Sequence, residues 1–149
     1  MEMVIEKAIE LNKCFLFDVT VYLKDTNMFG TSYFSRYFEW QGMVREEYYM
    51  KVKDGDKILE AGIKLVTKKA WIEYLKETHV FDKITIMLQN SNIRKYSFDM
   101  LFTYFNSTKD IIAIGGQTIT FLNKENKLTK IPQQILDLIS CHVLYNMRA

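Results

Sequence analysis

Residues 25–47 read DTNMFGTSYFSRYFEWQGMVREE, and the interpretation of the chain starts from this stretch. It begins with the turn residues Asp25-Thr26-Asn27 and continues into a segment in which five of the eight residues from Tyr33 to Trp40 are aromatic. A turn that opens a helix gathers backbone N–H groups, side-chain amides and charges at one point. A polar site of this kind, surrounded by apolar side chains, is suited to bind a polarised carbonyl group.

A helical period extends from about residue 33 to residue 50. One side of this helix carries Phe34, Phe38, Gln41 and Arg45, with Tyr37 and Val44 beside them, and the other side carries Arg36, Glu39, Met43 and Glu46. Because aromatic residues flank more than one side, we expect the helix to be mostly buried. Gly42 within it costs about 1 kcal/mol relative to alanine. We expect close approach of another backbone to offset that cost; the alternative is a locally weak helix.

Strand-forming residues dominate the rest of the chain. Alternation predicts a strand over residues 15–23, with Phe15, Phe17, Val19 and Val21 on one face. A high content of strand-forming residues predicts further strands over 59–76, 82–89, 96–106 and 111–122. A terminal amphipathic helix is expected after Pro132, a residue that a first helical turn tolerates. Its apolar positions are Ile131, Ile135, Leu138, Ile139 and Val143.

The order of a strand, a long helix and several meandering strands predicts the α+β class, with a curved antiparallel sheet wrapped around a central helix. We expect residues 1–149 to form one domain. One helix covers only one face of such a sheet. The exposed edges of the sheet favour pairing with another copy of the chain. Gly115-Gly116 inside a strand predicts a bulge or a close backbone contact.

Composition excludes several classes of function. Hydrophobic residues make up 48% and charged residues 26% of the 149 residues, which is typical of a soluble globular protein. No apolar run approaches the roughly 20 residues of a membrane span, and the N-terminus does not resemble a signal peptide. Cys14 and Cys141 suit neither a disulfide framework nor a zinc site, so we expect a cytoplasmic protein. A net charge of +2 is too mild to favour nucleic acid. No metal or cofactor motif is present.

The turn and helix resemble those of the hot-dog fold thioesterases of the 4-hydroxybenzoyl-CoA thioesterase-like branch, in which a turn of type Asp-x-Asp-x-x-Gly leads into a helix. The similarity is closer to the acyl-carrier-protein thioesterases of enediyne polyketide pathways. The matching residues are Thr26-Asn27, Gly30, Tyr33-Phe34, Tyr37-Phe38, Trp40-Gln41-Gly42 and Arg45-Glu46. Phe81-Asp82, Gly115-Gly116-Gln117 and Ile131-Pro132 add weaker matches.

The resemblance implies the chemistry and the site. The general branch has a catalytic carboxylate at the position of Asn27, whereas the enediyne group has asparagine there. By resemblance, the catalytic residues are Asn27, Tyr37 and Arg45, with Gly30 and Tyr33 at the oxyanion turn. The implied reaction is hydrolysis of a polyene β-ketoacyl thioester on an acyl carrier protein or polyketide synthase. The implied assembly is a homodimer, or a homotetramer formed from two dimers.

Each of these residues also has a plainer interpretation. Asn27 would cap the turn and Tyr37 would pack in the core. Arg45 would pair with Glu46 or Glu47, or cover apolar surface with the stem of its side chain. Glu39 is the nearest acid and a candidate general base, but pairing with Arg36 fits its position better. His79 and His142 lie in no nucleophile motif, so we expect structural roles for both.

Two other functions remain open. The first is that of a general acyl-CoA thioesterase. The second is that of a non-catalytic acyl-binding protein that has lost the carboxylate.

Overall fold

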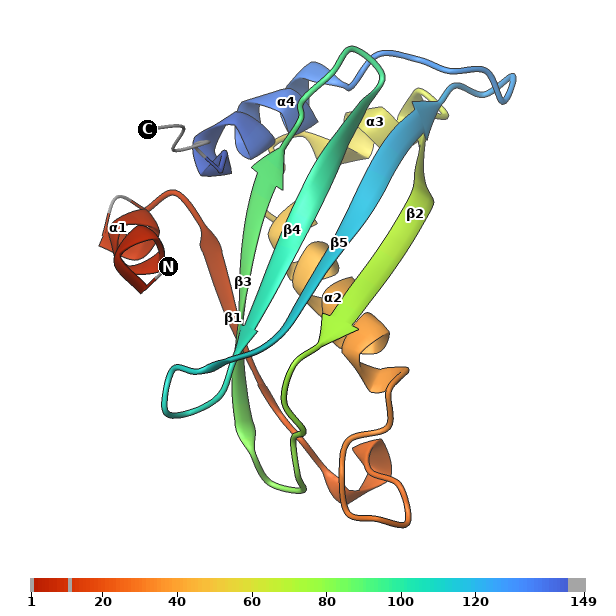
Figure 1. Ribbon diagram of the computed structural model, residues 1–149. Coiled ribbons are helices and arrows are strands. Elements are labelled where there is room, and N and C mark those ends of the chain that lie inside the picture. Colours follow the sequence, from red (N-terminus) through yellow and green to blue (C-terminus); the bar gives the residue numbers. More distant parts are fainter. Residues whose placement is uncertain (1, 11, 145–149) are drawn as a thin grey trace.

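A computed structural model describes residues 2–10 and 12–144 of the chain. Five antiparallel strands form one sheet in the order β1-β3-β4-β5-β2 (Figure 1). The strands are β1 (Phe15–Thr20), β2 (Lys64–Tyr74), β3 (Lys83–Ser91), β4 (Ser97–Phe105) and β5 (Ile111–Leu122). The helices are α1 (Glu2–Glu10), α2 (Arg36–Tyr49), α3 (Gly55–Glu60) and α4 (Gln133–Ile139), with short 3₁₀ turns at Leu23–Asp25 and Ser140–His142.

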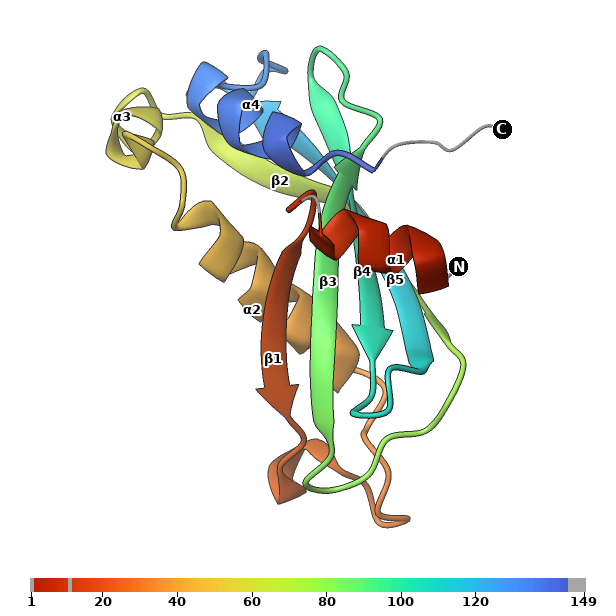
Figure 2. The same ribbon diagram turned by 90° about the vertical axis from the view of Figure 1, so that its left-hand side faces the viewer.

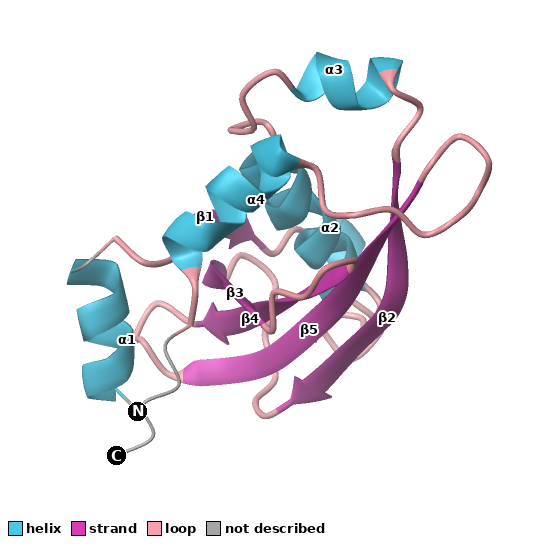
Figure 3. Cartoon of the chain, turned by 90° about the horizontal axis from the view of Figure 1, so that it is seen from above, coloured by secondary structure: helices cyan, strands magenta, loops and turns pink. Residues whose placement is uncertain are grey.

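The sheet curves around α2, which lies along its concave face (Figure 3). The predicted architecture of a curved antiparallel sheet around a long helix is therefore confirmed. Because β2 ends the strand order, one of its edges makes no ladder with another described strand. No helix in the described ranges is long and apolar enough to cross a membrane.

The core lies between α2 and the sheet. Helix α2 buries one stripe at helical spacing: Tyr37, Trp40, Gln41, Val44 and Tyr48. The sheet contributes apolar side chains that include Ile86, Phe98, Phe102, Ile119 and Phe121. The expectation that α2 would be mostly buried is wrong in part, because Phe34 and Phe38 are exposed, at 57% and 38%. Aromatic residues occur around much of this helix, so periodicity alone did not select the face that meets the sheet.

Helix α1 covers part of the opposite, convex face of the sheet (Figure 2). Its Ile5 packs against a small cluster formed by Cys14, Met87 and Phe105. The sequence analysis missed this helix, although Ile5, Ala8 and Ile9 have the i, i+3, i+4 spacing of an amphipathic helix.

Several predicted boundaries are wrong. Residues 59 and 60, predicted to begin a strand, belong to α3, and β2 starts only at Lys64. Strand β1 ends at Thr20 rather than at residue 23, where a 3₁₀ turn begins. Pro132 is the N-cap of α4 and precedes its first turn. Val143 lies beyond the terminal helix and bridges to Asn90 of β3.

The glycines of β5 confirm the predicted close contact. A Cβ atom at Gly115 would collide with the Gln41 side-chain amide and would lie 2.9 Å from the Trp71 carbonyl oxygen. At Gly116 it would lie 2.6 Å from the Trp71 indole nitrogen. The register of β5 with its neighbours shifts elsewhere, so neither glycine marks a bulge. A Cβ at Gly42 would meet no described atom within 4 Å, so close packing at Gly42 is not found among the described residues.

We predict that Gly115→Ala lowers the free energy of unfolding by about 1–3 kcal/mol, because the added methyl group overpacks the contact between α2 and β5. Urea denaturation at a fixed protein concentration measures the change. Gly42→Ala is the matched control, and it should be at least as stable as the native chain because the space is open. Equal stability of Gly115→Ala and the native chain would contradict the close contact.

Candidate functional site

Asn27 lies at the start of a tight loop that joins the first 3₁₀ turn to α2. Its side-chain oxygen accepts hydrogen bonds from the Phe29 backbone N–H (2.9 Å) and from the Thr31 hydroxyl (3.2 Å). Gly30 adopts φ +78°, a conformation that glycine adopts without strain, and its N–H donates to the Asn27 carbonyl. The Asn27 side-chain NH₂ donates no hydrogen bond to another described residue. Asn27 therefore stabilises the turn through its oxygen and retains two free donors.

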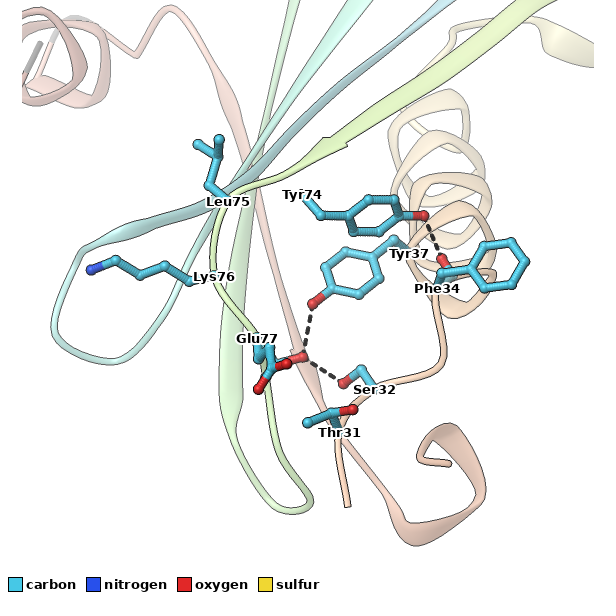
Figure 4. A pocket seen from close by; sticks show the side chains of 9 residues that line it. Thr31, Ser32, Phe34, Tyr37, Tyr74, Leu75, Lys76 and Glu77 are labelled. Atoms are coloured by element: carbon cyan, nitrogen blue, oxygen red, sulfur yellow. Dashed lines mark hydrogen bonds between the residues drawn. The ribbon is translucent and has the colours of Figure 1, made fainter. Parts of the chain in front are cut away.

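Tyr37 lies in the first turn of α2 and is buried, as the plainer interpretation expected. Its hydroxyl lies 2.9 Å from the Thr78 hydroxyl, which in turn contacts Ser32 (Figure 4). Burial raises the pKa of Tyr37 above its ordinary value, so the hydroxyl stays protonated at neutral pH. Tyr37 is therefore both a core residue and part of a hydroxyl network.

That network borders a cavity of about 280 Å³. Its lining residues come from the loop before α2, from α2 itself and from the end of β2: Thr31, Ser32, Phe34, Tyr37, Tyr74, Leu75, Lys76, Glu77 and Thr78. The Tyr74 hydroxyl donates to the Phe34 carbonyl (2.7 Å) and holds the end of β2 against the start of α2 (Figure 4). Thr78 was missed by the sequence analysis, because its place depends on the path of the chain after β2.

Arg45 lies two turns further along α2, half-buried against the other end of β2. Its Nη1 donates to the Thr67 hydroxyl (2.6 Å) and to the Gln117 side-chain oxygen (2.8 Å). Pairing with Glu46 or Glu47 is not found among the described residues. Nη2 and Nε make no hydrogen bond to a described residue, so one side of the guanidinium keeps its donors.

A bulge in β2 places Thr67 beside Arg45. Thr67 pairs with Ile119 and Lys69 with Thr118, so Lys68 is an extra residue in this strand. Residues three apart in a regular strand lie on opposite faces. With the extra residue, Thr67 shares a face with buried Ile119, and Ala70 shares the same face with Gln117. The bulge thus directs the Thr67 hydroxyl toward α2.

A second, mostly apolar cavity of about 530 Å³ lies near Arg45. It lies between the end of α2, the segment around α3, and the neighbouring ends of β2 and β5. Its lining residues are Tyr49, Val52, Gly55, Ile58, Leu59, Ile63, Lys64, Leu65, Phe121 and Ile135. Tyr49 follows Arg45 by one helical turn, and Leu65 precedes Thr67 by two strand positions on the same side. Arg45 itself does not line the cavity, which begins at the residues one helical turn after it on α2 and two positions before Thr67 on β2.

A single chain does not bring the predicted catalytic residues together. Arg45 lies eight positions after Tyr37, which corresponds to about 12 Å along the helix axis. Asn27 lies before the N-terminal end of α2, further still from Arg45. One polar group of the predicted site thus lies at each end of β2.

The remaining predicted residues have plain structural contacts. Glu39 forms the expected ion pair with Arg36 at 2.7 Å and is exposed. Tyr33 is 47% exposed, and its N–H donates to the Asp25 carbonyl. The His142 Nδ1 atom lies 2.7 Å from the Tyr48 hydroxyl oxygen. His79 is exposed, and its Nδ1 atom lies 3.9 Å from Oδ2 of Asp82. Among the described residues, no three His, Cys, Asp or Glu side chains form a group that could hold a metal ion.

Comparison with known proteins gives one matching family and many similar folds. The sequence profile of the Thioesterase-like superfamily matches residues 21–139. The dynemicin thioesterase, studied in crystal structures of polyene binding, superposes with a TM-score of 0.82 at 22% identity, covering 89% of this chain and 99% of the other. A 1,4-dihydroxy-2-naphthoyl-CoA thioesterase from Synechocystis superposes with a TM-score of 0.78 at 18% identity, covering 85% of this chain and 96% of the other. A gentisyl-coenzyme A thioesterase superposes with a TM-score of 0.73 at 14% identity, covering 84% of this chain and 99% of the other.

Proposed function

We propose that this chain, which belongs to the Thioesterase-like superfamily and is a thioester hydrolase of the hot-dog fold, releases a polyketide-type acyl chain from an acyl carrier protein. The observation that carries the proposal is the combination of a neutral amide at Asn27 with a cationic guanidinium at Arg45. Asn27 stands where a catalytic carboxylate is expected, and both its side-chain N–H groups are free. Arg45 is held by one nitrogen and offers the others to a ligand.

These donors suit thioester hydrolysis. In this reaction water adds to the carbonyl carbon, the C–S bond breaks, and the products are an acid and a thiol. The thioester is already activated, so the main requirement is to stabilise negative charge that develops on the carbonyl oxygen. The Asn27 amide, the guanidinium of Arg45 and the positive end of the α2 dipole all favour that charge.

Two carboxylates near the turn, those of Glu39 and Asp25, are engaged elsewhere. Glu39 is bound to Arg36 at the surface. Asp25 is 4% exposed, and it accepts a hydrogen bond from the Tyr22 N–H (2.9 Å) at the 3₁₀ turn. We therefore assign the general-base role to neither and propose a water positioned by neutral and cationic groups.

A second copy of the chain completes the proposed site. If β2 pairs in antiparallel fashion with β2 of another copy, the Thr67 end of one strand meets the Tyr74 end of the other. Arg45 of one copy then approaches the turn that carries Asn27 of the second copy. Met28 and Phe29, which are 91% and 81% exposed at the tip of this turn, would be covered by such pairing. We propose a dimer, or a tetramer of two dimers.

The apolar cavity beside Arg45 offers space for the acyl chain. Its volume of about 530 Å³ lies within the range of roughly 300–1,000 Å³ that is typical of ligand pockets. A thioester carbonyl bound at the guanidinium would direct the acyl chain along Tyr49 and Leu65 into this cavity. A polyene β-ketoacyl chain is the substrate that the resemblance to the enediyne group favours.

Three observations favour the carrier protein. The turn and helix match the enediyne group, and the dynemicin thioesterase has a similar fold. Carrier proteins are acidic, and exposed Lys68 and Lys69 lie on β2 at the proposed junction of the two copies.

Hydrolysis of acyl-CoA is the second candidate function. Two proteins of similar fold are named as thioesterases of aromatic acyl-CoA compounds, which favours this alternative. Binding of an acyl group without hydrolysis is a third, because the carboxylate is absent from the turn.

We predict that Arg45→Ala and Asn27→Ala each lower kcat by about 10²-fold or more while the protein stays folded, because each removes a donor aimed at the developing oxyanion. Steady-state assays with matched acyl-carrier-protein thioesters measure the loss, and thermal melting checks the fold. Asn27→Asp should also be slow, since a negative charge opposes the oxyanion.

Glu39→Gln is the matched control on the same helix, and we expect it to keep most of the activity. Native rates in both alanine variants together with an inactive Glu39→Gln would overturn this mechanism and assign the base to Glu39.

We also predict a higher kcat/KM for an acyl group on a carrier protein than for the same group on CoA. Mass spectrometry of the released acid, with both substrates at equal concentration, measures the difference. Equal or better use of CoA thioesters would support the second candidate, and tight binding without any release would support the third.

A further inference from the structure

Two buried glutamines connect Arg45 to the sheet. Gln41 of α2 is fully buried, and Gln117 of β5 is 6% exposed. The Gln117 side-chain NH₂ donates to the Gln41 side-chain oxygen (2.9 Å), and the Gln117 oxygen accepts from Arg45 (2.8 Å). Buried amides are costly unless their groups are paired, so this pair requires a reason.

A backbone group fixes which end of each amide, the NH₂ or the oxygen, faces each neighbour. The Gln41 NH₂ lies 3.4 Å from the Trp71 carbonyl oxygen, and a carbonyl can only accept. The Gln41 oxygen must then face Gln117, and the Gln117 oxygen must face Arg45. If both amides were reversed, the Gln117 NH₂ would face the guanidinium, which has donors alone, and the Gln41 oxygen would face the Trp71 carbonyl oxygen.

The fold provides space for this arrangement at a specific place. Gly115 lies on the same face of β5 as Gln117, two positions away, and any side chain there would occupy the position of the Gln41 amide. Thr67, placed by the bulge in β2, is the second acceptor for the same Arg45 nitrogen. Both acceptors therefore bind Nη1 and leave Nη2 and Nε for other partners.

We propose that Gln117 and Gln41 are positioning residues, which form a relay of amides from the Trp71 carbonyl to Arg45 and hold the guanidinium toward the thioester. The inference rests on the proposed function, in which Arg45 stabilises the oxyanion. The physical basis of the relay is preorganisation. A shift of about 1 Å in the position of a catalytic group can lower the reaction rate by roughly 10²-fold.

The test is a double-mutant cycle with Gln117→Met, which keeps the length of the side chain and removes both hydrogen bonds. We expect kcat for the carrier-bound thioester to fall about tenfold while KM changes little. In the Arg45→Ala background the same substitution should cause no further loss of kcat, because its effect passes through Arg45.

Thr118→Val is the matched control on the same strand. Thr118 donates to Asp99 (2.9 Å) on the opposite face of the sheet, so its loss should affect stability without affecting kcat. If Gln117→Met does not yield folded protein, Gln41→Met carries the same cycle, since it removes the acceptor that orients Gln117.

The outcomes separate the relay from the proposed function. A slow Arg45→Ala with native kcat in folded Gln117→Met or Gln41→Met overturns the relay alone. A loss in Gln117→Met that adds in full to that of Arg45→Ala also overturns it, because the glutamines then act by another route. Native kcat in Arg45→Ala overturns the proposed mechanism itself.

Discussion

Helix α2 is tied to the concave face of the sheet at three levels, and the geometry of the candidate site depends on these ties. The Tyr104 hydroxyl donates to the Tyr37 carbonyl (2.8 Å), Gln41 is bonded to Gln117, and the Asn90 amide donates to the Tyr48 hydroxyl (3.1 Å). Each tie joins a residue of the buried stripe to a strand. Apolar packing supplies most of the free energy of burial, but it does not fix the rotation of a helix with aromatic residues on several sides. The buried hydrogen bonds do so.

This fixed helix holds two polar groups at opposite ends of β2. The hydroxyl network of Tyr37 lies near the end of that strand, while Arg45 lies beside the bulge near its beginning. The separation would be unfavourable for catalysis in one chain. In the proposed dimer, antiparallel pairing of the two β2 edges would bring these unlike ends together. The guanidinium of Arg45 and the amide of Asn27 would then stabilise the developing charge in place of a carboxylate.

Much of the fold follows from the sequence, because the strands over 83–91, 97–105 and 111–122 have strong alternation or β-branched and aromatic content. The errors have physical causes. The helix over residues 55–60 is short and apolar only in part, so propensity did not separate residues 59 and 60 from the strand that follows. The exposed positions of Phe34 and Phe38 depend on the face that meets the sheet. Asn27 and Arg45 were identified by resemblance. Thr67, Thr78 and Gln41 could not be assigned their contacts, because these depend on the register of β2 and on residues distant in the sequence.

The central claim is that one site contains Asn27 of one copy and Arg45 of another, and complementation tests it most directly. Inactive Asn27→Ala and Arg45→Ala chains are unfolded together, refolded and assayed for thioester hydrolysis. A mixed dimer would carry one site with both substitutions and one native site. Random pairing should therefore restore about a quarter of the native activity. No activity in mixtures that contain verified mixed dimers would contradict the shared site.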